Sequence, residues 1–384
     1  MRILYVAHKS PFPIADGGCF AMMQLLQSLH QVAKIDALIY DTHKHPFTSA
    51  TQTKLASYCE QVFHLSVATE IKPIAALYAL LQHKNYNLSR YCSTEIKSFI
   101  ATNYSNYDAI VCDGLFSAAQ FASVSLGETK LIIRAHNVEH QIWGQQAQQN
   151  KSIFKRWYLK QLTRTLRQEE LNLLNKAQQV WTLSQADTSV LSALIQSPIT
   201  TIPISITTSS KEVDYTINQC FHLGSMNWTP NKEAVDYLIN ELWRKHTKLP
   251  KLVIGGSFLT ANSFPDLPEH CLLEGEVDDA LAFMAKSGIL VSPIKSGSGV
   301  RVKLLEALSL GVPVITTTIG ASGIAIEEAG IVIADSPNDF FVAINDLVAN
   351  EQKKRTIGEK GRNYIATHHQ ELTIINQIKT ALGN

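Results

Sequence analysis

The sequence lacks the features of a membrane-spanning or disulfide-stabilised protein. No run of about 18 uncharged apolar residues occurs, which argues against a spanning helix. The six cysteines are scattered without a C-x-x-C pair, so the pattern favours a reducing compartment over a disulfide framework. The first seven residues are typical of a short strand and not of a signal peptide. We therefore expect a cytoplasmic protein.

The chain also lacks a charge bias and two common nucleotide-site motifs. Its 34 Lys and Arg against 33 Asp and Glu leave a net charge of +1, which gives no overall attraction to nucleic acid. No D-x-D motif occurs, which argues against a metal-bound diphosphate, and neither glycine-rich turn reads G-x-G-x-x-G, which disfavours a dehydrogenase. We expect no nucleic-acid partner, no metal and no cofactor.

Short apolar runs separated by helical stretches are the main pattern that is present. A chain of 384 residues with 45% hydrophobic residues predicts two domains, and the alternation predicts βα units with parallel sheets. The predicted strands are 3–7, 35–40, 61–65, 109–112, 131–135 and 180–183, then 220–223, 252–254, 271–273, 289–292, 313–316 and 331–334. A Ser/Thr-rich stretch over 197–216 is the predicted linker.

These strands predict an α/β protein of two doubly wound, Rossmann-like domains with a ligand cleft between them. The expected bounds are 1–200 for the first domain, on the acceptor side, and 201–365 for the second, nucleotide-binding domain. Residues 366–384 are expected to form a helix that packs back on the first domain.

The segment from Val291 to Val314 is the most informative motif. Gly297 and Gly299 follow a predicted strand and let backbone amides approach a ligand, while Arg301 and Lys303 add full charges at the start of a predicted helix. Glu306 lies three residues after Lys303, on roughly the same helix face, where a carboxylate suits sugar hydroxyls. Together these groups suit a nucleoside diphosphate that carries a sugar.

The first domain offers two weaker motifs after its strands. Gly17 and Gly18 lead from the first strand into a helix, and such a pair taken alone is most often a turn. His136 follows the fifth strand; it reads as a polar contact to sugar or acceptor, a core or capping histidine, or, with His140, a zinc ligand that lacks a third partner. His140 and Glu139 are weaker candidates, because a helix over 139–149 could simply expose them.

The stretch from Lys151 to Arg167 has six cations interleaved with Trp157, Tyr158 and leucines. It is interpreted either as a solvated helix face over a packed one or as a peripheral contact with an anionic membrane surface on the cytoplasmic side.

At these residues the chain resembles GT-B-fold glycosyltransferases of family 4, the retaining enzymes that use nucleotide sugars. The resemblance spans nearly the whole chain, and its order and spacing are more specific than any one piece. The matching residues are Asp16 to Gly18, His136 to Glu139, Glu170, Ala177, Ser184, Gly224 to Asn231, Gly275 to Asp279, and Glu306 with the segment up to Val314.

The resemblance assigns donor contacts and shows two departures. Glu306 matches the second carboxylate of the family's E-x7-E motif, but the first falls on Ser298, which puts sugar recognition in doubt. Ser225 and Asn231 stand near the positions where the family often has diphosphate-binding cations, so Arg301 and Lys303 are expected to supply that charge. Val277 resembles the apolar contact to the nucleobase.

The resemblance implies a hexosyltransferase-type reaction of polysaccharide biosynthesis. A sugar would pass, with retention and without metal, from a nucleoside diphosphate sugar to a hydroxyl of a glycan, glycolipid or lipid-linked saccharide. His136, Arg301, Lys303 and Glu306 are the expected catalytic residues, none of them a nucleophile; Gly17, Gly18, Ser225, Val277, Gly297, Ser298 and Gly299 are the further donor contacts. Two alternatives stay open: a nucleotide-sugar epimerase or hydrolase on the same fold, and a non-catalytic sugar-nucleotide sensor.

Overall fold

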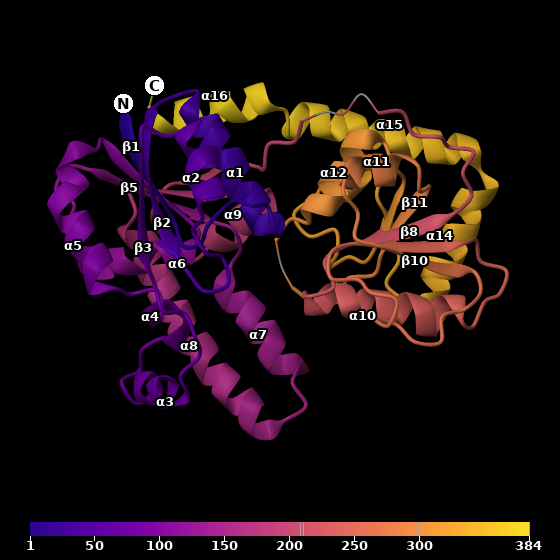
Figure 1. Ribbon diagram of the computed structural model, residues 1–384, viewed down its shortest axis with the longest axis horizontal. Coiled ribbons are helices and arrows are strands. Elements are labelled where there is room, and N and C mark those ends of the chain that lie inside the picture. Colours follow the sequence, from indigo (N-terminus) through magenta and orange to yellow (C-terminus); the bar gives the residue numbers. More distant parts are fainter. Residues whose placement is uncertain (208, 210, 298, 384) are drawn as a thin grey trace. The chain divides into compact units, whose positions relative to one another are not determined.

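The computed structural model describes residues 1–207, 209, 211–297 and 299–383. The chain divides into two compact units, the first formed by Met1–Ser205 with Ile374–Asn384 and the second by Ile206–Thr373 (Figure 1). Each unit is a parallel β-sheet with helices, and the prediction of two Rossmann-like α/β domains is confirmed.

The first unit contains a seven-stranded parallel sheet in the order β3-β2-β1-β4-β5-β6-β7. Its strands are β1 (Arg2–Ala7), β2 (Lys34–Asp41), β3 (Gln61–Ser66), β4 (Ala109–Asp113), β5 (Lys130–Ala135), β6 (Gln179–Thr182) and β7 (Ile199–Thr201). Its helices are α1 (Gly17–His30), α2 (Ser49–Ala56), α3 (Pro73–Leu81), α4 (Tyr86–Ser89), α5 (Thr94–Asn103), α6 (Leu115–Ala118), α7 (Glu139–Gln149), α8 (Ile153–Lys176), α9 (Gln185–Ser192) and α16 (Glu371–Leu382), with short 3₁₀ turns at Tyr104–Asn106 and Ala119–Ser123.

Strand β1 shows why these apolar runs form a central strand. Leu4 and Val6 belong to the core on one face of the sheet, whereas Ile3 and Tyr5 belong to the core on the other. All four are fully buried. Because side chains alternate across a strand, a run that is apolar at every position requires helices on both faces.

The predicted linker over 197–216 is wrong in its first part. Ile199–Thr201 forms β7, which pairs in parallel with β6 through Val180 opposite Ile199 and Thr182 opposite Thr201. A three-residue edge strand has too few apolar side chains to stand out from Ser/Thr-rich sequence.

The last helix completes the core of the first unit. Ile374, Ile378 and Leu382 of α16 are buried in the same cluster as Ile3 and Tyr5 of β1. The first strand and the last helix of the chain therefore share one hydrophobic core.

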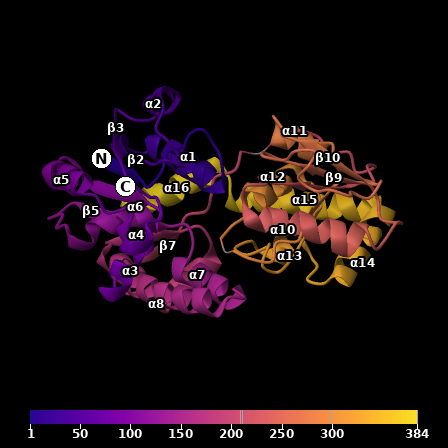
Figure 2. The ribbon, with the colours of Figure 1, turned by 60° about the horizontal axis from the view of Figure 1, so that its bottom comes forward.

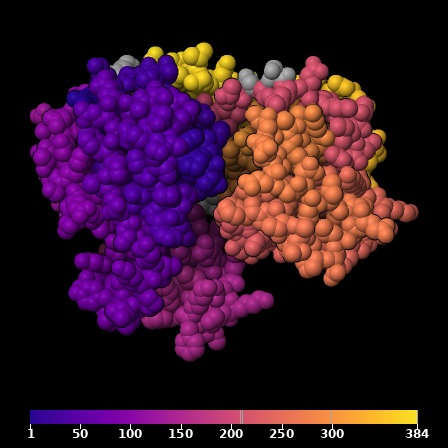
Figure 3. Space-filling model, viewed as in Figure 1, coloured from indigo at the N-terminus to yellow at the C-terminus, as the bar shows by residue number. Residues whose placement is uncertain are grey.

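Helix α3 and the α7–α8 hairpin form a lobe of the first unit, visible in both ribbon views (Figures 1 and 2) and in the space-filling view (Figure 3). The lobe has its own small core, in which Ala79 of α3 packs with Ala147 of α7 and with Leu159 and Leu162 of α8. None of the helices in the described residues is both long and apolar enough to cross a membrane.

The second unit contains a six-stranded parallel sheet in the order β10-β9-β8-β11-β12-β13. Its strands are β8 (Cys220–Leu223), β9 (Leu252–Gly255), β10 (Cys271–Gly275), β11 (Ile289–Ser292), β12 (Val314–Thr316) and β13 (Val332–Ile333). Its helices are α10 (Thr229–Tyr237), which continues as a π-helical turn (Leu238–Trp243), α11 (Ala280–Ala285), α12 (Val302–Leu310), α13 (Ile326–Ala329), α14 (Pro337–Ala349) and α15 (Glu351–His368).

We predict that Ile378→Ala destabilises the first unit by about 2 to 5 kcal/mol, because the substitution leaves a cavity beside β1. Leu372→Ala on the same helix is the matched control, since Leu372 is 66% exposed and should change the free energy of unfolding by less than about 0.5 kcal/mol. Urea unfolding followed by circular dichroism measures both variants. Equal stability of the two would contradict the placement of α16 in the core.

Candidate functional site

The residues singled out from the sequence gather where strand order reverses in each sheet. In the first unit the reversal lies between β1 and β4, and in the second between β8 and β11. In doubly wound sheets, ligands bind beside such a reversal, at the carboxyl ends of the strands. Gly17 and Gly18 follow β1 and His136 follows β5, while Arg301 and Lys303 lie after β11.

The loop after β11 contains two glycines in left-handed conformations. Gly297 has φ 92° and Gly299 has φ 82°, values that L side chains rarely adopt. The Arg301 guanidinium folds back over this loop and donates from Nη1 to the Gly299 carbonyl oxygen at 3.1 Å and from Nη2 to the Ser296 carbonyl oxygen at 3.3 Å. Ser298 lies outside the described residues.

Arg301 is the N-cap residue of α12 and is 8% exposed. Its guanidinium carbon lies 5.6 Å from the ring centre of Trp228. Burial lowers the pKa of Arg301 to about 10, so the group stays charged at neutral pH while it has lost most of its hydration.

Lys303 reaches from the first turn of α12 to the end of β8. Its Nζ donates to the Leu223 carbonyl oxygen at 3.0 Å and to Asn231 Oδ1 at 2.9 Å, and lies 3.3 Å from His222 Nε2. Burial, and secondarily the charge of Arg301, lower the pKa of Lys303 to about 7. Within the described residues this ammonium contacts neutral acceptors and forms no ion pair.

The hydrogen bonds of His222 determine its tautomer and its contact with Lys303. The ring is fully buried, and its Nδ1 lies 2.9 Å from the Val291 carbonyl oxygen, to which Nδ1–H donates. Burial, together with Lys303, holds the pKa of His222 well below its usual value, so the ring is neutral and Nε2 accepts from Lys303. Sequence reasoning missed His222, because a histidine in an apolar strand carries no motif.

Asn231 links the two loops of this unit. It is 5% exposed, donates from Nδ2 to the Ser225 carbonyl oxygen at 3.0 Å and accepts from Lys303 through Oδ1. Gly224 is required here, because a Cβ on it would lie 2.5 Å from Asn231 Nδ2. The sequence marked Asn231 merely as a position that lacks a cation, whereas in the structure it holds the cation supplied by α12.

Glu306 lies just over one turn into α12 and is largely buried. Burial raises its pKa to about 7. Its carboxylate makes no hydrogen bond or ion pair within the part of the chain that is described, although Lys303 is three residues away. A desolvated carboxyl without a protein partner is suited to hydroxyl donors from a ligand.

The other predicted donor contacts of this unit lie at the ends of β8 and β10. Ser225 Oγ lies 2.7 Å from Ser257 Oγ and donates to Asn227 Oδ1 at 2.8 Å. Val277 is partly buried, and its Cγ2 would lie 2.9 Å from a Cβ on Gly255. Both residues follow strands at the same edge of the sheet as Lys303.

Asp113 organises the equivalent edge of the first unit. It is fully buried at the end of β4, with Oδ1 2.5 Å from His136 Nε2 and 3.4 Å from Arg134 Nη1, and Oδ2 2.7 Å from the Tyr5 hydroxyl. Burial alone would raise the pKa of Asp113, but Arg134, His136 and the hydrogen bonds outweigh it and lower the pKa to about 2. The carboxylate therefore stays ionised and orients His136, whose side chain is 13% exposed.

His8 is a second histidine at this edge, and the sequence analysis did not single it out. Burial, followed by the charges of Lys9 and His136, lowers its pKa to about 3, so the ring is neutral. Its Nδ1 lies 3.2 Å from the Asp113 carbonyl oxygen and is the donor. Gly114, at φ 95°, leaves room for the ring, since a Cβ there would lie 2.9 Å from His8 Nδ1.

Gly17 and Gly18 form the first turn of α1, and Asp16 caps it by accepting from the Cys19 amide at 2.7 Å. Lys9 Nζ holds both carboxylate oxygens of Asp16, at 2.8 and 2.7 Å. A Cβ on Gly18 would lie 3.1 Å from Asp16 and 3.2 Å from Lys9, so a side chain there would crowd this ion pair.

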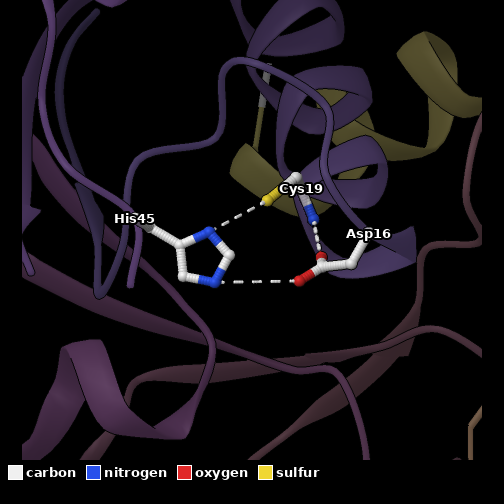
Figure 4. Close-up of side chains that lie close together, drawn as sticks. All are labelled: Asp16, Cys19 and His45. Carbon is white, nitrogen blue, oxygen red and sulfur yellow. Dashed lines mark hydrogen bonds and ion pairs between the residues drawn. The ribbon is translucent and has the colours of Figure 1, made fainter. Parts of the chain in front are cut away.

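Asp16, Cys19 and His45 point toward one another, with ligand atoms within 4.8 Å (Figure 4). Two of the three side chains have other partners: Asp16 pairs with Lys9, and the Cys19 thiol donates to the Ser10 carbonyl oxygen at 3.6 Å. Burial raises the pKa of Cys19, which disfavours the thiolate that a metal needs. The cluster is better explained as the packing of the α1 cap.

Helix α7 does not expose Glu139 and His140, the possibility that made them weaker candidates in the sequence. His140 is 8% exposed, and its Nδ1 lies 2.6 Å from Oε2 of the buried Glu170. Glu170 also accepts the amides of Glu139 and His140 at 2.8 and 3.0 Å, and so caps α7. Burial, and then the charge of Glu170, raise the pKa of Glu139 to about 7. The zinc reading of the two histidines fails, because His136 and His140 bind different carboxylates.

Residues 218–350 match the family model described as Glycosyl transferases group 1. An uncharacterized glycosyltransferase of Methanocaldococcus jannaschii is 33% identical over 90 residues, which are 23% of this chain and 25% of that relative. The match thus spans about a quarter of the relative's length. An uncharacterized 44.6 kDa protein in the cps region of Klebsiella pneumoniae is 19% identical over 98% of each chain.

Two crystal structures share the fold over the full length. Anabaena HepE in complex with UDP superposes with a TM-score of 0.69 at 14% identity, covering 100% of both chains. A variant of Staphylococcus aureus TarM, in complex with fondaparinux, alpha-GlcNAc-glycerol and UDP, gives a TM-score of 0.70 at 12% identity, again over 100% of both. The fold is that of GT-B glycosyltransferases, and the family match supports a glycosyltransferase.

We predict that Asp113→Asn destabilises the first unit by about 2 kcal/mol at neutral pH. The folded-state pKa of Asp113, about 2, lies below the ordinary value, so its contribution is present above about pH 4 and is lost as pH falls toward 2. Unfolding by urea between pH 7 and pH 2.5 should show a steeper loss of stability for the wild type than for the variant. Parallel curves would show that folding does not lower the pKa of Asp113.

Proposed function

We propose that the protein transfers a sugar from a nucleoside diphosphate sugar to an acceptor hydroxyl. The observation that carries the proposal is the Lys303 ammonium, largely buried at the ends of β8 and β11 and held within the described residues by neutral acceptors. A desolvated cation beside a second cation, Arg301, is complemented best by an anion with more than one charge. A diphosphate supplies those charges.

The donor is assigned to the second unit. We propose that Arg301, Lys303 and the loop amides around Gly297 and Gly299 bind the diphosphate, with the N-terminus of α12 adding partial positive charge. Glu306 accepts from the ribose hydroxyls, and Val277 contacts the base. The UDP bound by HepE and TarM supports uracil as the first base to test.

The first unit is assigned to the sugar and the acceptor. His136, held by Asp113, offers an oriented ring at the edge of the sheet, and the amides of Gly17 and Gly18 lie at the N-terminus of α1. The acceptor is proposed to be a glycan, a glycolipid or a lipid-linked saccharide. The glycan and sugar-glycerol molecules bound to the TarM variant support this class.

The reaction is proposed to proceed with retention and without a metal. The acceptor oxygen bonds to the anomeric carbon on the face from which the diphosphate departs, the bond from that carbon to the phosphate oxygen breaks, and the released phosphate takes the acceptor proton. Arg301 and Lys303 stabilise the negative charge that develops on the diphosphate. Ser298 is proposed to contact the sugar where the resembled family has a carboxylate.

Lys303→Met should weaken binding of the nucleoside diphosphate about 10- to 100-fold, since one charge-assisted contact is lost. Lys286→Met is the control, because it removes the same charge from an exposed site of the same unit. Calorimetry with UDP, then with other nucleoside diphosphates, measures both variants.

Turnover of a panel of UDP-sugars, with and without a saccharide acceptor, tests the reaction. Donor consumption that is equally fast without acceptor would indicate a hydrolase or epimerase. Donor binding without turnover would indicate a sensor.

Glu306→Gln should lower donor affinity about tenfold while the melting temperature of the free protein changes little, since the amide keeps the shape but loses charge-assisted acceptance. A nucleoside diphosphate whose ribose is replaced by 2′,3′-dideoxyribose should bind wild type and variant alike. If the Glu306→Gln variant bound both ligands about tenfold more weakly than the wild type, the assignment of Glu306 to the ribose would be wrong.

Donor affinity should fall as pH rises above about 7. A bound diphosphate favours the charged form of Lys303 and raises its pKa from about 7, so above that pH binding takes up a proton and weakens up to about tenfold per pH unit. The pKa of Glu306 is also about 7, and its ionisation as pH rises would strengthen donor binding. The measurement therefore uses Glu306→Gln, in which this group does not titrate. Adding Lys303→Met should flatten the profile from pH 6 to pH 9; a slope that persists would assign the proton to another group.

A further inference from the structure

Helix α3 presents its large apolar side chains outward. Ile74, Leu77, Tyr78 and Leu81 are 86, 59, 61 and 71% exposed. Their spacing of i, i+3, i+4 and i+7 places them on one helix face. The opposite face packs against the lobe through a small residue, Ala79, which is 7% exposed. A helix of a soluble protein normally shows the reverse arrangement, with large apolar residues inward.

The start of α8 adds a second group of exposed apolar side chains. Ile153, Phe154 and Trp157 are 77, 87 and 55% exposed, and they precede Leu159, the first residue of α8 that is buried. These three residues belong to the first turns of α8, directly after the loop that joins it to α7.

The two groups belong to one lobe of the first unit. Ala79 of α3 and Leu159 of α8 share its small core, and Tyr158 packs against that core next to Trp157. Both ribbon views place α3 beside α8 (Figures 1 and 2). We call the seven exposed apolar residues of α3 and α8 the lobe surface.

The two segments that carry the lobe surface bear charges of one sign. Residues 71–84 contain two Lys and residues 151–168 contain six Lys or Arg, eight in all, and neither range contains Asp or Glu. The net charge of the whole chain is only +1, so the lobe is a local concentration of positive charge. All six cations of residues 151–168 are exposed.

We propose that the lobe surface docks on an anionic lipid bilayer. The apolar side chains enter the boundary between headgroups and acyl chains, and the eight cations contact lipid phosphates. The charge pattern disfavours a second copy of this chain, because a symmetric contact would bring two sets of eight cations together. Lipid phosphates supply the opposite charge along the whole lobe.

Vesicle co-sedimentation of the full chain without donor or acceptor tests the proposal, so that an inactive protein would still bind. Vesicles with about 30% phosphatidylglycerol should bind the protein at least about tenfold more tightly than pure phosphatidylcholine, and raised salt should weaken this binding. No binding, or equal binding to both lipids, would overturn the proposal.

Leu77→Glu, on α3, should weaken binding to the anionic vesicles about tenfold. Val342→Glu is the matched control, because Val342 is 57% exposed on α14 of the other unit and Leu77 is 59% exposed. Both variants remove one exposed apolar side chain and add one carboxylate. Equal weakening by the two variants would exclude α3 as the contact.

Trp157 provides a direct readout of insertion. Its fluorescence should shift to shorter wavelength with anionic vesicles, and Trp157→Phe should lose most of the shift while it still binds. Sedimentation equilibrium without lipid tests whether a second copy of this chain binds the lobe surface instead. A dimer that Leu77→Glu dissociates, together with absent vesicle binding, would assign the lobe surface to a second copy.

Discussion

Parallel strand pairing is the constraint on which both units depend. Every strand pair in the two sheets is parallel. Parallel strands need crossover connections, so all their carboxyl ends meet at one edge, and helices must cover both faces. The interior becomes apolar, and the polar groups collect at that edge. Asp113 and His136 in the first unit, and Lys303 and Asn231 in the second, occupy equivalent places for this reason.

The two edges deal with buried charge in opposite ways. Asp113 is surrounded by Arg134, His136 and the Tyr5 hydroxyl, and these partners keep its carboxylate ionised despite burial. Lys303 has neutral partners within the described residues, and its pKa falls to about 7. The first arrangement is complete as folded, whereas the second leaves a charge that a ligand can satisfy. That contrast supports the proposal that the second edge binds a ligand, whereas the first positions His136.

The sequence predicts the framework of the fold well, because central parallel strands are continuous apolar runs. It misses β7, whose three residues resemble the loop around them, and it misreads the surroundings of His140, because Glu170 is thirty residues away in sequence and adjacent in space. The same limit applies to His222, whose role depends on Lys303 and Val291. Glycines and cations near the start of a helix form a motif that can be recognised in the sequence. Contacts with residues on other strands leave no such motif. The roles proposed for Arg301, Lys303 and Glu306 stay predictions.

The shared core of β1 and α16 has a consequence for how the chain folds as it is made. The second unit is built from one continuous segment, 206–373, whereas the first unit closes its core with residues of α16, which are synthesised after that segment. A ribosome-bound chain can therefore complete the second unit while the first still exposes the face of its sheet that α16 covers. The core of the first unit is therefore complete only after α16 has left the ribosome, later than the whole segment that builds the second unit.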